Sequence, residues 1–457
     1  MEDTIVAIST PNGEGAIGII RMSGENSFEV INKIFVNKSK NNLESYKNRE
    51  LIYGHIMDGE NVIDEVLVSL MKSPNTYTTE NVVEINCHGG SVPIRRILDL
   101  ILTFDVRMAD PGEFTKRAFL NGRLDLSQAE SVMDLISAKT PKGFDVAYNQ
   151  LEGYLSVKIN TIRDKLLELM SKIEVSIDYP EEDIKDITHN EILNELNENK
   201  NIINKMLKNS ETGKIIKNGL STVIIGKPNV GKSSLLNALL KEAKAIVTNI
   251  PGTTRDVIEE YVNINGIPLK IIDTAGIRET DNEIEKIGVN RSKSFFNKAD
   301  LVIFVLNNAE EISKEDREII QYIEDKKVII VINKTDLESK IDFNELNELL
   351  KNKIMIRTSI TNEHGIEEVE DEIAKMVYNG DIKSSENEYI TNIRHINLIK
   401  KAFNSINAAI NATESAIGYD FIEVDIKDAY DYLGEITGDT IGEDVIDKIF
   451  SNFCLGK

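Results

Sequence analysis

Four near-continuous apolar runs constrain the fold of this chain more than any other feature. They cover residues 221–225, 269–272, 301–306 and 328–332, and patterns typical of helices lie between them. Strands that are buried on both faces of a parallel sheet have this composition, whereas strands with one solvated face alternate. The region 216–380 is therefore predicted to form a doubly wound α/β domain.

The segments on either side predict two other kinds of domain. In residues 1–121, short β-branched segments and one helical stretch favour an α+β domain; the strands are expected at 4–8, 17–20, 62–71 and 82–85, and the helix at 91–103. In 122–215, apolar residues recur every three or four positions, which predicts one long helix from Leu151 to Ile177 and a second from Leu193 to Leu207.

The pattern is helical again in residues 381–457, at 393–409 and 421–453. We expect a helical domain that is split in sequence, with parts at 122–215 and 381–457, and with the α/β domain inserted into it. A chain of 457 residues is long enough for about two to four domains.

Composition and net charge limit the cellular compartment and the kinds of partner that we expect for this chain. The net charge of −23 disfavours sequence-independent binding to nucleic acid, although Lys116, Arg117 and Arg123 form one candidate basic surface. Ordinary solvated charge explains that trio equally well. Cys87 and Cys454 are predicted to be free thiols in a reducing cytosol. No segment approaches the roughly 20 apolar residues of a membrane span, and the acidic N-terminus does not resemble a signal peptide, so we expect a cytoplasmic protein.

A phosphate-binding loop follows the first apolar run and precedes a helical pattern at 235–240. Its sequence, Gly-Lys-Pro-Asn-Val-Gly-Lys-Ser at 226–233, has the G-x-x-x-x-G-K-S spacing. Glycines let backbone N–H groups approach phosphate oxygens, Lys232 reaches the β- and γ-phosphates, and Ser233 can ligate Mg²⁺. The candidate phosphate-binding residues are Gly226, Asn229, Val230, Gly231, Lys232, Ser233 and Ser234.

Two further motifs follow apolar runs, and the second of them identifies the base. Asp273 and Gly276, in Asp-Thr-Ala-Gly, are placed to hold Mg²⁺ through water and to sense the γ-phosphate. Asn333, Lys334 and Asp336, in Asn-Lys-Thr-Asp, suit guanine, because the Asp336 carboxylate can accept from N1–H and N2–H₂, a donor pair that adenine lacks. The three motifs in order predict a GTP-hydrolysing switch protein. The final motif, Thr358-Ser359-Ile360-Thr361, is weaker, because Ile360 stands after Ser359 where a small residue is usual.

The sequence leaves alternatives open for the Mg²⁺ ligand in the switch loop and for the group that orients the attacking water. Thr254 is the first candidate for binding Mg²⁺ when the γ-phosphate is present, and its neighbour Thr253 is the second; ordinary turn chemistry is the alternative. Ile277 follows Gly276 where many GTPases have a water-orienting glutamine, so that group must come from elsewhere. Each carboxylate of 279–285 is more simply a solvated charge. Asn229 is either a ligand of a monovalent cation or a turn-stabilising residue.

Segments outside the nucleotide motifs carry a resemblance to a known family. The segments at 4–7, 111–122 and 124–130 and the ending Phe-Cys-Leu-Gly-Lys at 453–457 resemble those of the bacterial tRNA-modification GTPases MnmE, also called TrmE, over nearly the whole chain. The resemblance implies a folate-binding N-terminal domain that also forms a homodimer, a split helical domain and an inserted Ras-like G domain.

The resemblance also implies a reaction and partners. With the flavoprotein MnmG, which carries FAD and forms a heterotetramer with it, the family adds a carboxymethylaminomethyl or aminomethyl group to C5 of the wobble uridine of certain tRNAs. A tetrahydrofolate derivative, in its methylene or formyl form, supplies the one-carbon unit. Neither the amine donor, the set of tRNAs nor the way in which GTP hydrolysis is coupled to modification follows from the sequence.

Functional residues carried over from the family fall on matching positions. The folate-binding positions match Arg21, Glu84, Arg123 and Lys457. The K⁺ ligands match Asn229, Thr248, Ile250 and Thr253, the Mg²⁺-binding threonine matches Thr254, and the water-orienting glutamate matches Glu285. The family directs the tail that contains Cys454 toward folate, so this thiol either acts in the chemistry or packs the tail as a small apolar side chain.

Three other functions fit parts of the sequence. A ribosome-assembly GTPase shares an Asn-containing phosphate loop but needs a basic RNA-binding appendage, which the sequence does not show. A nucleotide-gated scaffold would hydrolyse GTP slowly and without K⁺ stimulation. The G domain of a ferrous-iron transporter is disfavoured because no membrane helix is predicted.

Overall fold

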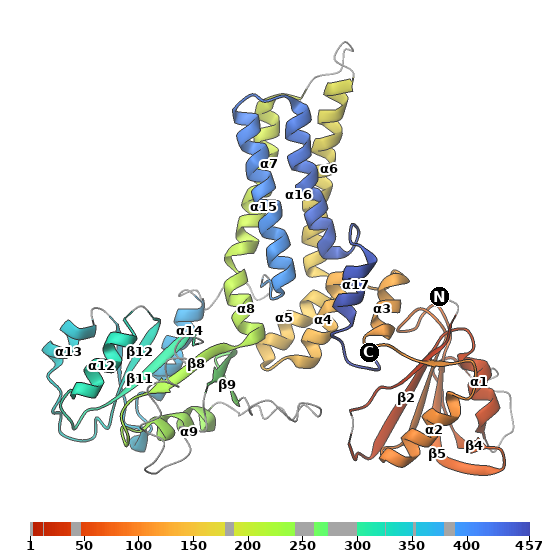
Figure 1. The fold of residues 1–457 in the computed structure, drawn as a ribbon, viewed down its shortest axis with the longest axis horizontal. Coiled ribbons are helices and arrows are strands. Elements are labelled where there is room, and N and C mark those ends of the chain that lie inside the picture. The colour runs from red at the N-terminus through yellow and green to blue at the C-terminus, as the bar shows by residue number, and fades with distance from the viewer. Residues whose placement is uncertain are drawn as a thin grey trace.

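The computed structural model describes residues 3–11, 13–37, 47–178, 187–242, 260–272, 299–324, 326–350, 353–378 and 389–457. Three bodies are visible in Figure 1: an upright helical bundle, an α/β domain at its lower left and a mainly β domain at its lower right. The C-terminus lies between the bundle and the β domain. No described helix is both long enough and apolar enough to cross a membrane.

The N-terminal domain is built on a seven-stranded sheet in the order β3-β4-β5-β6-β2-β1-β7. Neighbouring strands are antiparallel except for the β1–β7 pair. The strands are β1 (Ile5–Ile8), β2 (Ile17–Ser23), β3 (Phe35–Val36), β4 (Leu51–Asp58), β5 (Asn61–Met71), β6 (Val82–His88) and β7 (Arg107–Met108). Helices α1 (Ser27–Ile34) and α2 (Ser91–Ile101) contribute to one hydrophobic core with the sheet. Helix α3 (Glu113–Leu120) follows β7.

The helical domain consists of two segments of the chain that pack together. The first holds α4 (Leu126–Ser137), α5 (Pro141–Leu151), α6 (Tyr154–Asp178), α7 (His189–Lys208) and α8 (Ser210–Asn218). The second holds α15 (Ile393–Glu414), α16 (Tyr419–Thr437) and α17 (Glu443–Phe450). The apolar stripes of α6, α7, α15 and α16 meet in one core, as their three-to-four-residue spacing predicts.

The inserted domain has a six-stranded sheet in the order β13-β12-β11-β8-β10-β9. All neighbouring pairs are parallel except β9–β10. Its elements are β8 (Leu220–Ile225), α9 (Lys232–Glu242), β9 (Glu260–Ile264), β10 (Ile267–Ile271), β11 (Leu301–Asn307), α12 (Lys314–Tyr322), β12 (Val328–Asn333), α13 (Phe343–Leu350), β13 (Ile354–Arg357), η2 (Ile360–Asn362) and α14 (Ile366–Tyr378). Core clusters lie on both faces of this sheet, as the unbroken apolar runs predict.

The predicted fold class is confirmed, and two predicted helices are wrong because each is interrupted. The stripe that starts at Leu151 is not continuous, because α5 ends at Leu151 and α6 begins at Tyr154. Gly153 between them has φ +87°, a left-handed conformation that interrupts a right-handed helix. The predicted helical stretch at 421–453 is likewise two helices, α16 and α17, and Gly438, with φ +96°, follows the first.

Candidate functional site

The phosphate loop joins the end of β8 to the start of α9, and two glycines fit it into a crowded space. Gly226 has φ +146°, and a Cβ there would lie 2.3 Å from the Val305 carbonyl oxygen. Gly231 has φ +108°, and its Cβ would lie 2.2 Å from Nδ2 of Asn333. Asn229 also has a left-handed backbone, with φ +61°, which asparagine tolerates better than most residues. Larger residues at either glycine would displace the loop.

Lys232 lies across the phosphate loop. Its Nζ donates to the carbonyl oxygens of Gly226 and Lys227, each at 2.7 Å. The loop also leads into the N-terminus of the eleven-residue helix α9. A fixed ammonium group, a helix N-terminus and a tight glycine loop together suit the phosphates of a nucleotide.

An ion pair behind the loop was not predicted from the sequence. Lys227 forms a 2.9 Å ion pair with the buried carboxylate of Asp316, in the first turn of α12. Burial alone would lower the pKa of Lys227, but Asp316 and Glu310 outweigh it and raise that pKa. Lys227 therefore stays charged and ties the phosphate loop to α12. Lys227 and Asp316 are far apart in the sequence, so no local pattern predicts this contact.

The base-recognition corner is assembled by buried hydrogen bonds. Nδ2 of Asn333 donates to the Val230 carbonyl oxygen at 2.9 Å, and Oδ1 accepts from the Thr358 hydroxyl at 3.3 Å. Asn333 thus connects the phosphate loop to the final motif. The Ser359 hydroxyl donates to Oδ1 of Asp336 at 2.6 Å, which orients the carboxylate predicted to accept from guanine.

Ile360, which departs from the usual final motif, is accommodated by its backbone. Its N–H donates to Oδ1 of Asn333 at 3.4 Å, and its side chain packs against the core of the domain. The contact with Asn333 needs only the amide, so a large side chain does not disrupt this corner.

Several predicted site residues lie outside the described residues. They are Thr248, Ile250, Thr253, Thr254, Asp273, Gly276 and Glu285. Strand β10 leads directly toward Asp273, since the Ile272 N–H still pairs with the Thr222 carbonyl.

A second cluster forms where the N-terminal sheet meets the C-terminal tail. Arg21 on β2 faces Glu84 on β6 in the sheet register, and its Nε and Nη2 donate to Glu84 Oε1 at 2.8 and 2.7 Å. Nη1 of Arg21 donates to the Gly456 carbonyl oxygen at 3.2 Å, and the Ser9 hydroxyl donates to the same oxygen at 3.3 Å. Residues from the two ends of the chain therefore meet at one site.

Tyr77 is the central aromatic group of this cluster and was not predicted from the sequence. The Arg21 guanidinium lies 5.4 Å from its ring centroid and that of Arg123 lies 4.6 Å from it. Its hydroxyl is 2.9 Å from the Thr115 hydroxyl of α3. The ring thus places two of the predicted folate-binding arginines side by side, a contact that no local pattern around Tyr77 signals.

The tail completes the cluster. Gly456 has φ +83°, and a Cβ there would lie 2.4 Å from the Ile8 carbonyl oxygen, so only glycine brings the tail this close. Burial and the nearby charge of Arg21 lower the pKa of Lys457. A negatively charged ligand would offset this repulsion between cations. Both thiols are free, with Cys454 exposed and Cys87 buried, so Cys454 is not a buried apolar side chain.

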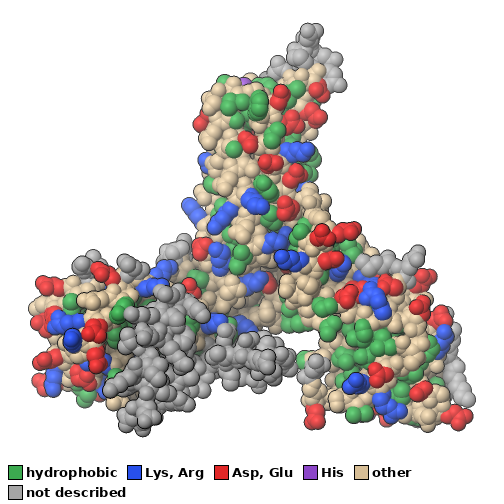
Figure 2. All heavy atoms as spheres, in the orientation of Figure 1, with side chains coloured by type: hydrophobic (Ala, Val, Ile, Leu, Met, Phe, Trp, Pro, Cys, Tyr) green, Lys and Arg blue, Asp and Glu red, His purple; other side chains and the backbone are tan. Residues whose placement is uncertain are grey.

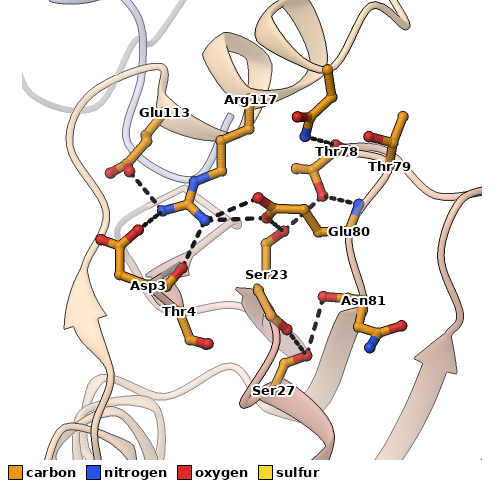
Figure 3. Close-up of polar contacts among 12 residues, drawn as sticks. Asp3, Thr4, Ser23, Ser27, Thr78, Thr79, Glu80, Asn81, Glu113 and Arg117 are labelled. Atoms are coloured by element: carbon orange, nitrogen blue, oxygen red, sulfur yellow. Dashed lines mark hydrogen bonds and ion pairs between the residues drawn. The ribbon is translucent and has the colours of Figure 1, made fainter. Parts of the chain in front are cut away.

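The candidate basic surface of Lys116, Arg117 and Arg123 is wrong. The Arg117 side chain is 0% exposed and forms ion pairs with Asp3, Glu80 and Glu113, as Figure 3 shows. Lys116 pairs with Asp447 of α17 at 2.5 Å. The sequence alone predicts that Arg117 lies on the surface, because arginine is rarely buried. In the structure, three carboxylates compensate the charge of its buried side chain. Arg117 fixes α3 beside the arginine–tyrosine cluster, which consists of Arg21, Arg123 and Tyr77.

Comparisons with known proteins match the whole chain. Residues 4–123 match the model described as the GTP-binding protein TrmE N-terminus, and residues 126–454 match that of the MnmE helical domain. A tRNA modification GTPase MnmE from Alkaliphilus oremlandii is 55% identical over 459 residues, with 100% of both chains covered. The same-named protein of Clostridioides difficile is 54% identical over 457 residues, again with 100% of both covered.

Solved structures with a similar part include the FeoB G-domain from Methanococcus jannaschii. It is 26% identical, with a TM-score of 0.26, and the match covers 35% of this chain and 97% of that one. The full-length relatives and the two family models settle the classification. This chain belongs to the MnmE family of tRNA modification GTPases and is a GTP-hydrolysing enzyme of tRNA modification.

Proposed function

We propose that this GTPase uses a tetrahydrofolate one-carbon unit and acts with the FAD-carrying flavoprotein MnmG to add a carboxymethylaminomethyl or aminomethyl group to C5 of the wobble uridine. The observation that carries the proposal is the cluster of Arg21, Glu84, Arg123 and Lys457, with Tyr77 beside the two arginines. These residues come from β2, β6, the α3–α4 connection and the C-terminal tail. Arg21 and Arg123 lie over the Tyr77 ring, Glu84 pairs with Arg21, and Lys457 interacts electrostatically with Arg21 and Glu84.

The chemistry of the cluster suits a folate. Folate combines a flat ring with carboxylates, so cationic side chains can pair with the carboxylates and an aromatic ring can stack on the flat ring. Glu84 can accept from the donor edge of the pterin. When bound, the tetrahydrofolate derivative supplies the one-carbon unit. Arg21, Arg123 and Lys457 would hold and orient it, and the exposed Cys454 is a candidate for a chemical role beside it.

GTP hydrolysis in this proposal depends on Mg²⁺ and K⁺. Ser233 and Thr254 would hold Mg²⁺, and Asn229, Thr248, Ile250 and Thr253 would hold K⁺. A cation beside the β- and γ-phosphates neutralises charge that develops in the transition state, as an arginine finger does. Lys232, which already crosses the loop, would bind the phosphates, and Glu285 would orient the attacking water.

A homodimer that binds MnmG is part of the proposal, and the N-terminal sheet supports it. One face of that sheet is covered by α1 and α2, whereas Leu51, Tyr53 and Leu67 on β4 and β5 are exposed. Tyr53 and Leu67 are paired in register, so their side chains share a face. Figure 2 shows hydrophobic side chains gathered on this domain. Such a patch is typical of an interface. The two free thiols fit the proposed cytoplasmic location.

Binding and modification assays on two variants test the folate site. We expect Arg21→Ala to weaken binding of formyl-tetrahydrofolate at least about tenfold, because it removes charge-assisted contacts. Arg96→Ala, which changes an exposed arginine on α2, should bind normally. Cys454→Ser preserves size and should keep folate affinity and GTP turnover while losing wobble-uridine modification. Unchanged affinity in Arg21→Ala would reject the folate site, and full modification by Cys454→Ser would leave Cys454 without a chemical role.

A further inference from the structure

Helix α4 contacts both connections through which the G domain is inserted. On the way in, Lys217 of α8 forms a 2.7 Å ion pair with Asp134 of α4. Only Gly219 separates α8 from strand β8 of the G domain. On the way back, Arg394 and His395 at the start of α15 contact Glu130 of α4, at 2.5 and 2.6 Å. The two connections are thus held by one short helix.

These contacts are specific and largely buried. The Glu130 and Asp134 side chains are only 10% and 11% exposed. Asn392, the N-cap of α15, also donates to Glu130 Oε1 at 3.0 Å. Glu130 and Asp134 are four positions apart, so both lie on one face of α4. Because a buried ion pair adds little net stability over apolar residues, what these pairs supply is a defined geometry.

Other residues of α4 pack against the elements that form the arginine–tyrosine cluster. Leu126 and Ala129 pack with Phe450 and Phe453, just before the tail that carries Gly456 and Lys457. Val132 packs with Ala118 of α3 and with Leu124. Asp125, which caps α4, is two residues from Arg123. One helix therefore contacts the G-domain connections with one set of side chains and the cluster's supports with another.

We propose that α4 couples the position of the G domain to the arginine–tyrosine cluster, and that Glu130 and Asp134 are positioning residues for tRNA modification. A reorientation of the G domain would pull on α8 and on the start of α15. The ion pairs would pass this movement to α4, and α4 would shift Arg123 and the C-terminal tail together. Among the residues that the structure describes, neither carboxylate contacts the phosphate loop or the base-recognition motif, so we expect GTP hydrolysis itself not to require them.

The inference rests on the proposed function, and Asp134→Asn tests it in the full-length chain. Burial raises the pKa of Asp134 and Lys217 offsets this only partly, so an uncharged amide is tolerated in the fold. We expect Asp134→Asn to keep GTP turnover and formyl-tetrahydrofolate affinity within about twofold while wobble-uridine modification in cells falls about tenfold. Glu198→Gln, which removes an exposed ion pair between α6 and α7, should modify tRNA normally.

A charge exchange distinguishes coupling from damage to the fold. Lys217→Asp alone should lose modification, and the double variant Asp134→Lys with Lys217→Asp should regain it. Full modification by Asp134→Asn, or a parallel loss of GTP turnover that the exchange does not restore, would overturn the inference. If the wild-type chain itself does not modify wobble uridine, the proposed function fails instead, so the two failures are distinguishable.

Discussion

The Asp336 carboxylate is oriented by a neighbouring side chain of the protein. The Ser359 hydroxyl donates to one carboxylate oxygen at 2.6 Å, and Asn333 and Thr358, both buried, fix the surrounding backbone. A carboxylate held in this way does not have to be ordered again when it accepts from guanine, so less binding free energy is lost.

Asp336→Asn should change which nucleotide binds. An amide offers a donor where the carboxylate had an acceptor, so one of its two contacts with guanine becomes repulsive. We expect GTP affinity to fall by about tenfold to a hundredfold, and xanthosine triphosphate to bind better than GTP. Competition binding with the two nucleotides measures this. Asp342→Asn, which changes the carboxylate that precedes α13, is the control and should not alter the preference. An unchanged preference in Asp336→Asn would exclude Asp336 from base recognition.

Sequence reasoning at the residue scale found the groups that carry chemistry but missed the ones that position them. Asn333 and Asp336 stand in a recognisable tetrapeptide, and Arg21 and Lys457 in segments shared with a family. Tyr77, Lys227 and Arg117 act through partners that are distant in the sequence, such as Asp316 for Lys227. Periodicity and local motifs carry no information about such pairs.

Elements were predictable where one period dominates and unpredictable where the chain turns sharply. The apolar runs of β8, β10, β11 and β12 were all predicted, because strands buried on both faces have an unbroken composition. Strand β4 was missed. It contains Gly54, where a Cβ would lie 2.5 Å from the Phe35 ring, so packing rather than strand propensity selects this residue. The break at Gly153 was missed because apolar spacing continues on both sides of it.

At the scale of elements, the contact between α4 and α15 should be sensitive to acid. Burial would raise the pKa of Glu130, but His395 and Arg394 outweigh it and hold that pKa well below its ordinary range. The stabilisation from Glu130 is therefore complete above the unfolded-state pKa of about 4.3 and is lost as the pH falls below it toward the folded pKa.

Glu130→Gln tests this contact. The change leaves the Arg394 guanidinium without its carboxylate partner, so we expect it to lower the free energy of unfolding by about 3 kcal/mol at pH 7. The difference from wild type should shrink as the pH falls below about 4. Urea unfolding at several pH values measures both effects, with Glu198→Gln as a control worth less than about 1 kcal/mol. A difference that does not depend on pH would show that charge is not the basis of the contact.

The whole molecule brings together segments that are far apart in the sequence. Arg21 and Gly456 are hydrogen-bonded across 435 positions, and Glu130 and His395 across 265. The split helical domain and the inserted α/β domain were predicted from changes of period along the chain. The meeting of the tail with the N-terminal sheet followed only from family resemblance, because no local signal encodes a contact of this range.

The rate of GTP hydrolysis by the whole protein should depend on which monovalent cation is present. We expect K⁺ to raise GTP turnover at least about tenfold over Na⁺, which corresponds to about 1.4 kcal/mol of barrier. The smaller Na⁺ should fit poorly in a site sized for K⁺.

Glu285→Ala should lower turnover in K⁺ but leave GTP affinity nearly intact, because orientation of the water matters mainly in the transition state. Equal rates in the two salts would contradict a K⁺ site, and a loss of affinity in Glu285→Ala would make that residue structural.

Mass spectrometry of the wobble uridine decides whether this chain is needed for its modification. Transfer RNA is isolated from cells that lack this protein, and from the same cells after the full-length chain or its Arg21→Ala variant is restored. We predict that the carboxymethylaminomethyl or aminomethyl group at C5 is absent without the protein and returns with the wild-type chain. It should not return with Arg21→Ala. Fully modified wobble uridine in cells that lack the protein would contradict the account.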